Sequence, residues 1–138
     1  MKYDVFISYA SKRLDAAKAV RSVLEDNGIK CWMAPDDIPA GAKYGSTVIS
    51  SIKECKALVF LFSAESALSP WVESELNIAF TNRKPIISYK IDASKFEDYD
   101  ELYIMLNNRP CVDSGSDFNA ALAELVKVVA GVVGVVPQ

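Results

Sequence analysis

Short apolar runs alternate with helical patterns along the whole chain. The runs predict five strands, over residues 3–7, 29–33, 57–62, 85–91 and 111–112. The run ALVFLF, residues 57–62, is apolar at every position, which is typical of a central strand that is covered on both faces. Between the runs, apolar residues recur at helical spacing from Pro70 onwards and over residues 12–27, 45–55 and 118–129.

This alternation of strands and helices predicts an α/β fold. Parallel strands that are joined through helices need right-handed crossovers, and these place helices on both faces of the sheet. The alternation alone does not determine the strand order. We expect a flavodoxin-like three-layer sandwich, with a five-stranded parallel sheet in the order 2-1-3-4-5. In such sheets ligands bind beside the carboxyl ends of the strands, near the point where the strand order reverses. The segments that follow the strands are therefore where we expect the functional residues.

The segment SPWVESELNIAF, residues 69–80, predicts a helix with a clear start. Ser69 is a good N-cap, and Pro70 suits the first helical position. A rotation of about 100° per residue places four apolar side chains on one arc. These side chains, which we expect to face the core, are Val72, Leu76, Ala79 and Phe80.

Trp71 and Glu75 are four residues apart, so they lie on the same side of this helix, at one border of the apolar arc. Glu73 lies roughly opposite Glu75, past the other border. Only Glu75 is therefore placed to share a pocket with the indole. The helix alone leaves two interpretations open: a solvated surface acid beside an indole at the core edge, which is the commoner situation, or a functional pair.

Composition and charge exclude several classes of protein. The 138 residues suit one domain, which we expect to span residues 1–138. The net charge is -3 and the chain has no basic cluster beyond Lys12-Arg13, so we expect no nucleic-acid partner. The longest apolar run is far shorter than a membrane span, and no signal peptide precedes the first strand. We therefore expect a cytoplasmic protein without membrane contact.

The chain contains no histidine, which excludes Ser-His-Asp and Cys-His nucleophile systems and most zinc sites. Its three cysteines are widely spaced, and we expect them to be buried thiols in a reducing compartment, with no metal. These cysteines are Cys31, Cys55 and Cys111.

The phosphate-binding motifs of other α/β proteins are missing. Neither G-x-G-x-x-G nor G-x-x-x-x-G-K-S/T is present, which argues against a bound dinucleotide cofactor of the Rossmann kind and against a P-loop. A phospho-receiver domain would need acids after the first and third strands and a lysine after the fifth. This chain has Ser8, Ser63 and Asp113 there.

Three stretches together resemble the Toll/interleukin-1 receptor (TIR) domain, in its prokaryote-style, NAD+-cleaving branch. They are YDVFISYAS at residues 3–11, GIKCWMAPDDIPAG at 28–41 and SPWVESEL at 69–76. The third matches the S-x-W-x-x-x-E pattern of the enzymatic members, and the likeness covers nearly the whole chain. It implies that Glu75 is the catalytic residue. The residues that it implies for substrate binding are Trp71, Ser8, Tyr9, Ala10, Pro35, Asp37 and Tyr44, the last standing where relatives often have Trp.

The resemblance also implies a reaction and partners. TIR enzymes cleave NAD+ between nicotinamide and ribose, with NAD+ as a substrate and no cofactor or metal. Water as the attacking group gives ADP-ribose, and a group of the same molecule gives a cyclic ADP-ribose variant; the residues leave both open. Family members self-associate, here through a loop at residues 34–44, and act in immune (antiphage) signalling, where a nucleotide product activates a downstream effector. The alternatives are a non-catalytic TIR adaptor, which signals through TIR–TIR assembly, and another small parallel α/β domain.

Overall fold

The computed structural model describes residues 3–115 and 117–136, and its centre is a five-stranded parallel sheet. The strand order is β2-β1-β3-β4-β5, which confirms the predicted order 2-1-3-4-5. The strands are β1 (Val5–Ser8), β2 (Cys31–Trp32), β3 (Ala57–Phe62), β4 (Ile86–Lys90) and β5 (Cys111–Asp113). The order reverses between β1 and β3, so a ligand site is expected beside the carboxyl end of β1.

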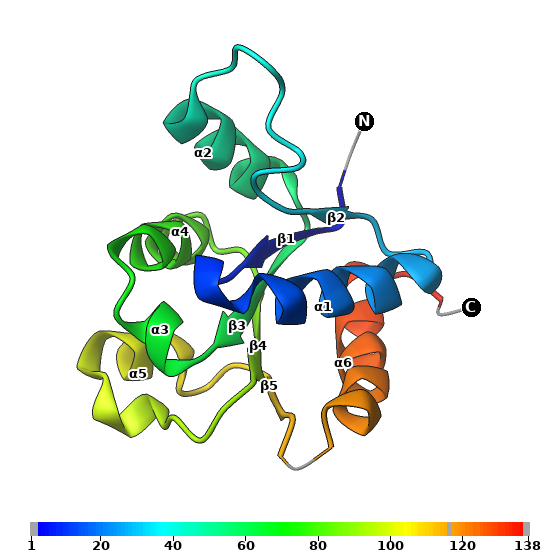
Figure 1. Ribbon diagram of the computed structural model, residues 1–138, viewed down its shortest axis with the longest axis vertical. Helices are drawn as coiled ribbons and strands as arrows, with labels where there is room; N and C mark the ends of the chain where they lie inside the picture. The colour runs from blue at the N-terminus through cyan, green and yellow to red at the C-terminus, as the bar shows by residue number, and fades with distance from the viewer. Residues whose placement is uncertain (1–2, 116, 137–138) are drawn as a thin grey trace.

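Helices cover both faces of this sheet, so the fold is the expected three-layer sandwich (Figure 1). One face carries α1 (Leu14–Asp26) and α6 (Phe118–Val133). The opposite face carries α2 (Tyr44–Glu54), α4 (Pro70–Thr81) and α5 (Asp100–Leu106). Shorter turns complete the chain: η1 (Ser11–Arg13), α3 (Ala64–Ala67) and η2 (Phe96–Asp98).

The alternation of side chains along the strands divides the core into two clusters. In β3, Phe60 packs with the helices α2, α4 and α5, whereas Val59 packs with α1 and α6. All six residues of β3 are buried, as its uninterrupted apolar sequence predicts. In β1 the same alternation places Phe6 and Ser8 toward α4 and Ile7 toward α1. A polar residue therefore occupies a core-facing position at the end of β1.

The predicted elements differ from the observed ones mainly at their ends. β2 has only two residues because Met33 no longer pairs with β1: its backbone N–H donates to the Asp37 carboxylate at 2.9 Å, and its carbonyl accepts from the Asp37 N–H. Three short elements are absent from the prediction: α3, η2 and α5, which have four, three and seven residues. Such short elements do not repeat the helical period often enough to be recognised.

Two predicted burials are wrong. Phe80 is 41% exposed, because the buried arc of α4 is rotated toward Glu75 and leaves Phe80 at its border, where the Arg109 guanidinium lies 5.3 Å from its ring centroid. Cys111 is exposed, because it lies on the edge strand β5, where Val112 alone is buried. Cys31 and Cys55 are buried as expected.

No helix in the described residues is long and apolar enough to cross a membrane. Within the same residues, no three side chains of the types that bind metals gather into a possible metal site.

Candidate functional site

The start of α4 determines which of its glutamates is buried. Ser69 caps the helix by accepting a hydrogen bond from the Val72 N–H at 3.2 Å, and Pro70 is the first helical residue, as predicted. With the helix fixed in this phase, Val72, Glu75, Leu76 and Ala79 form its buried face. The otherwise apolar buried face of this helix therefore includes one carboxylate. Glu75 is 5% exposed, so the interpretation of a solvated surface acid is wrong.

The carboxylate of Glu75 has a neutral partner rather than a cation. The hydroxyl of Ser8, at the carboxyl end of β1, donates a hydrogen bond to Oε1 of Glu75 at 2.7 Å. Glu75 has no part in the ion pairs found among residues 3–115 and 117–136. Burial raises the pKa of Glu75 to about 7, and the Ser8 and Trp71 side chains act in the opposite direction.

An open cleft of about 390 Å³ lies beside this carboxylate. Its walls come from the end of β1, the start of α2, the start of α4 and the loop after β2. The residues that line it are Ile7, Tyr9, Ser11, Ala34, Pro35, Tyr44, Ser69, Trp71 and Glu75. The cleft thus lies at the point where the strand order reverses, which is the expected place for a ligand in this class of sheet.

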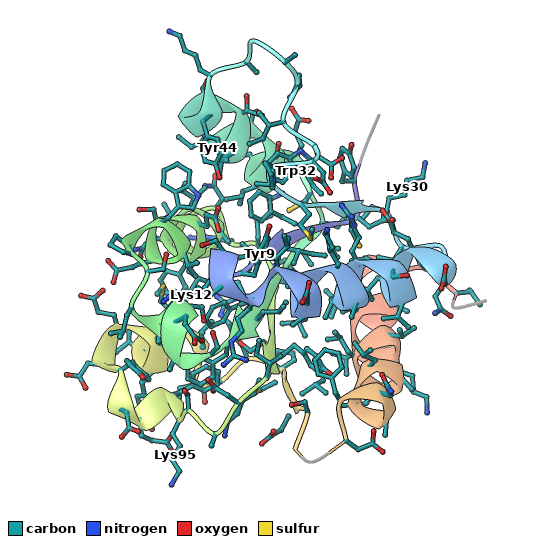
Figure 2. The ribbon with its side chains drawn as sticks, in the orientation of Figure 1. Tyr9, Lys12, Lys30, Trp32, Tyr44 and Lys95 are labelled. Atoms are coloured by element: carbon teal, nitrogen blue, oxygen red, sulfur yellow. The ribbon has the colours of Figure 1, made fainter. Side chains whose placement is uncertain are left out.

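Two aromatic side chains form one rim of the cleft. The rings of Tyr44 and Trp71 lie 4.8 Å apart between centroids, with their planes inclined by 50°. Tyr44 is the first residue of α2 and Trp71 the second of α4, so two helices that lie side by side both present an aromatic ring at the cleft. Figure 2 labels Tyr44 at the start of α2 and Tyr9 just beyond the end of β1.

Tyr9 joins the end of β1 to the loop after β2. Its hydroxyl donates a hydrogen bond to the carbonyl oxygen of Ala34. Burial and the nearby Asp36 carboxylate raise its pKa, so the phenol keeps its proton at neutral pH. Two loops that contribute to the cleft wall are therefore connected by a hydrogen bond.

The turn that follows Tyr9 is held in place by Arg13. Its Nε atom lies 2.9 Å from Oε1 of Glu65 in α3, and its Nη2 atom lies 3.3 Å from Oδ2 of Asp92 after β4. Asp92 also accepts a hydrogen bond from the N–H of Ala64 at 2.9 Å. These contacts connect the segments after β1, β3 and β4, and α3 leads directly to the start of α4.

The chain matches a known protein family. The family model of the TIR domain matches residues 5–126. The chain belongs to the TIR domain family. A comparison of this TIR domain with curated proteins finds no match.

Solved structures of other TIR proteins have the same fold. The TIR domains of the activated Roq1 resistosome, which directly recognises the pathogen effector XopQ, superpose with a TM-score of 0.70 at 21% identity, over 94% of this chain and 98% of theirs. The TIR domain of the Toll-related receptor TRR-2 from Hydra magnipapillata gives 0.72 at 18% identity, over 93% of this chain and 98% of that one. A TIR-STING receptor from C. gigas gives 0.74 at 18% identity; the match covers 93% of this chain and 40% of that receptor.

The structure of this TIR domain brings five of the eight predicted site residues to the cleft wall: Glu75, Trp71, Tyr9, Pro35 and Tyr44. The other three are not among the residues that line the cleft. Ser8 is fully buried against Glu75, and Ala10 is 8% exposed at the start of the η1 turn. Asp37 accepts the Met33 N–H inside the loop after β2.

Sequence reasoning missed the role of two hydroxyl side chains at the cleft, Ser11 and Ser69. Ser69 was predicted only as a helix cap, and that role is observed. Ser11 comes three residues after the end of β1, and its position after a central strand was the signal that could have pointed to it.

Proposed function

We propose that this TIR domain cleaves the bond between nicotinamide and ribose in NAD+, as a nucleosidase or ADP-ribosyl cyclase. The observation that supports the proposal most directly is the carboxylate of Glu75, which is buried, forms no ion pair within the described part of the chain, and borders a cleft beside two aromatic rings. A lone buried carboxylate is costly unless a ligand makes use of its charge.

The cleft suits the nicotinamide riboside half of NAD+. Its volume of about 390 Å³ is at the small end of the range for ligand sites, so we place this half in the cleft and the ADP half outside it. The nicotinamide ring carries a positive charge, and the faces of Trp71 and Tyr44 attract it by roughly 1–2 kcal/mol when it is desolvated. The Glu75 carboxylate then balances the positive charge of the ring after the ring has lost its water.

The chemistry requires little besides this carboxylate. The charged ring leaves as neutral nicotinamide, so the departure needs no general acid, cofactor or metal, and NAD+ itself is the substrate. The barrier is the formation of a positively charged, oxocarbenium-like ribosyl centre. A fixed carboxylate stabilises that centre electrostatically or through the ribose hydroxyls. Glu75 is therefore assigned as the catalytic residue.

The second step needs a base, and Glu75 has a suitable pKa. At a pKa of about 7, the ionised carboxylate can accept a proton from the group that attacks the ribosyl centre. If water attacks, the product is ADP-ribose; if a hydroxyl or adenine nitrogen of the same molecule attacks, the product is a cyclic ADP-ribose variant. The proposal includes both outcomes.

We place the reaction in cytoplasmic immune signalling of the antiphage kind, with a downstream effector that senses the nucleotide product. A homo-oligomer formed through TIR–TIR contacts, with the loop of residues 34–44 reaching a neighbour, is part of the proposal. The similarity to TIR domains from an activated resistosome supports such an assembly. Specific activity is then expected to rise with protein concentration, and a flat dilution series would count against the assembly.

A non-catalytic adaptor is the second candidate. Two apolar side chains, Leu68 after α3 and Ile104 on α5, are 75% and 76% exposed, and such residues are common in surfaces that bind other proteins. An adaptor would use these surfaces and leave NAD+ unchanged.

The test is NAD+ turnover by the purified protein at high concentration, with the products separated by chromatography and identified by mass. Glu75→Gln keeps the size of the side chain and removes its charge. Glu73→Gln is the matched control, because Glu73 is on the same helix but exposed. Loss of turnover in Glu75→Gln alone is the expected result. No turnover in any of the three proteins, even when assembly is forced by crowding, would favour the adaptor.

A further inference from the structure

The side chain that donates a hydrogen bond to the buried Glu75 carboxylate comes from the end of β1. Ser8 is the last residue of this strand, and its side chain points toward α4, on the same face of the sheet as Phe6. The register places Ser8 beside Phe60 of β3 and Phe60 beside Ser88 of β4. Ser8 and Ser88 are thus hydroxyl side chains in one row across an otherwise apolar face, and both are buried.

The two serines differ in what their hydroxyls contact. The Ser8 hydroxyl donates to the Glu75 carboxylate at 2.7 Å across 67 positions of sequence. The Ser88 hydroxyl has no hydrogen-bond partner in the described parts of the chain. The buried hydroxyl of Ser8 therefore has a specific hydrogen-bond acceptor, whereas the buried hydroxyl of Ser88, two strands away, has none among the described residues.

Ser8 is not placed to contact a substrate. Its side chain is 0% exposed, and it is behind the cleft wall, of which Glu75 forms a part. Any effect of Ser8 on a ligand in the cleft must therefore pass through the carboxylate. The hydrogen bond fixes the orientation of Oε1 and stabilises its negative charge in surroundings that otherwise disfavour it.

The other groups that face Glu75 do not replace this hydrogen bond. Tyr9 after β1 and Tyr44 of α2 interact electrostatically with Glu75, and burial raises the pKa of both phenols, so neither carries charge at pH 7. Trp71, on the same helix, also favours the ionised carboxylate, but its side chain is 44% exposed at the rim. No described cation pairs with Glu75.

We propose that Ser8 is a positioning residue, which keeps the Glu75 carboxylate ionised and correctly oriented for the reaction at the ribosyl centre. This inference rests on the proposed function for its effect on catalysis, but the hydrogen bond itself has a consequence that does not depend on turnover. Without the Ser8 hydroxyl, the ionised form of Glu75 loses its buried donor, and the carboxylate must hold its proton to higher pH.

The experiment compares Ser8→Ala with Ser88→Ala, two variants that each remove one buried hydroxyl from the same face of the sheet. The first readout is the NMR titration of 13C-labelled glutamate carboxyl groups, with the Glu75 signal identified by its loss in Glu75→Gln. We expect the midpoint for Glu75 to rise by about one pH unit in Ser8→Ala, the size of shift that a hydrogen bond to a charged group supports, and to stay unchanged in Ser88→Ala.

The second readout is the pH dependence of NAD+ turnover. In Ser8→Ala we expect kcat/KM to fall about tenfold at pH 7, and part of this loss to return at higher pH. Ser8→Cys, a weaker donor of similar size, is expected to lie between Ser8→Ala and the wild type.

The outcomes separate the inference from the proposed function. An unchanged Glu75 midpoint in a folded Ser8→Ala variant would overturn the role of Ser8, whatever the turnover. Absence of turnover in the wild type, together with a shifted midpoint in Ser8→Ala, would overturn the proposed function and leave the control of Glu75 by Ser8 in place. If Ser8→Ala does not fold, the Ser8→Cys titration decides, and a midpoint equal to that of the wild type contradicts the inference.

Discussion

Tyr44 and Trp71 belong to different helices, and their rings pack together with centroids 4.8 Å apart while both side chains remain more than two-fifths exposed. Each ring therefore holds the other in place at the rim of the cleft, at the cost of leaving apolar surface in water. Under the proposed function, such a pair serves as a preorganised platform for a flat, positively charged ligand.

Removing one ring is expected to weaken binding of the substrate. Tyr44→Ala leaves the indole of Trp71 without its neighbour, and we expect KM for NAD+ to rise about tenfold, which corresponds to about 1.4 kcal/mol of lost aromatic contact. Tyr44→Phe keeps the ring and should resemble the wild type. Steady-state kinetics check this, with Tyr103→Ala on α5 as the control, since Tyr103 is similarly exposed and is not among the residues that line the cleft. Equal KM values for Tyr44→Ala and Tyr103→Ala would show that the platform does not hold the substrate.

The buried charge of Glu75 is expected to lower the stability of the fold at neutral and alkaline pH. The carboxyl group has an ordinary pKa of 4.5 and a pKa of about 7 in the folded protein, so the folded state holds the proton more tightly. Its contribution to stability is therefore fully present below about pH 4.5 and is lost as the pH rises to about 7.

Glu75→Gln removes this cost while keeping an oxygen that accepts from Ser8. We expect the variant to be more stable than the wild type at pH 8, by on the order of 2 kcal/mol, and the difference to vanish toward pH 4. Urea unfolding at several pH values measures it, with Glu73→Gln as the control. A constant difference across pH would mean that the charge of Glu75 is not the cause.

Ionisation of Glu75 is expected to have the opposite effect on turnover: activity rises with pH, whereas stability falls. The reaction needs the ionised carboxylate, so kcat/KM should increase with pH, pass its midpoint near the Glu75 pKa of about 7, and reach a plateau above it. Bound NAD+ places a positive ring beside the carboxylate and lowers its pKa, so the midpoint for kcat should lie at lower pH than that for kcat/KM. Identical midpoints in the two profiles would argue against direct contact between the ring and Glu75.

Two neighbouring aspartates, Asp37 and Asp36, allow a controlled test of whether order in the loop after β2 affects substrate binding. Asp37 accepts the Met33 N–H at 2.9 Å within the loop, whereas Asp36 is 51% exposed and pairs with Arg21 at the surface. We expect Asp37→Ala to loosen the loop and raise KM several-fold, because a backbone donor near the end of β2 loses its charged partner. Asp36→Ala should change little, since an exposed ion pair contributes less than about 1 kcal/mol. Hydrogen exchange over residues 33–43 measures the order of the loop in both variants, and steady-state kinetics measure KM. If Asp37→Ala exchanges faster but keeps the KM of the wild type, the order of the loop does not affect substrate binding.

The expected sheet order came from the fold class as a whole. Local patterns were sufficient to predict only the central strand β3 and the start of α4. Each of these depends on neighbours in sequence: six consecutive apolar residues in β3, and a cap followed by proline at Ser69-Pro70. Helical geometry also placed Glu75, and not Glu73, beside Trp71. The rotation of the buried arc was not predictable in the same way. It depends on how α4 packs on β1 and β3, and this packing buries Glu75 and exposes Phe80.

The hydrogen bond between Ser8 and Glu75 was beyond local reasoning for a similar reason. Ser8 ends a strand and Glu75 lies in a helix that begins eight residues after a different strand, so only the order of the strands brings them together. The family resemblance placed both residues at one site, but it could not say that Ser8 would be behind the cleft wall. The exposure of Cys111 likewise depends on which side chains of β5 face the core: Val112 alone is buried, and a three-residue strand is too short for its apolar pattern to reveal this.

The absence of a cation beside Glu75, in the parts of the chain that the structure describes, makes the charge of the ligand decisive. Oxidised nicotinamide dinucleotide carries a positive ring and the reduced form does not, although the two have nearly the same shape. Under the proposed function, a cleft that relies on its ligand for charge balance favours the oxidised form, and NADH is expected to be a poor competitor for it. In the proposed reaction the same dependence acts after the bond breaks: once the ring is neutral nicotinamide, the attraction that captured it is gone, and the product is free to leave.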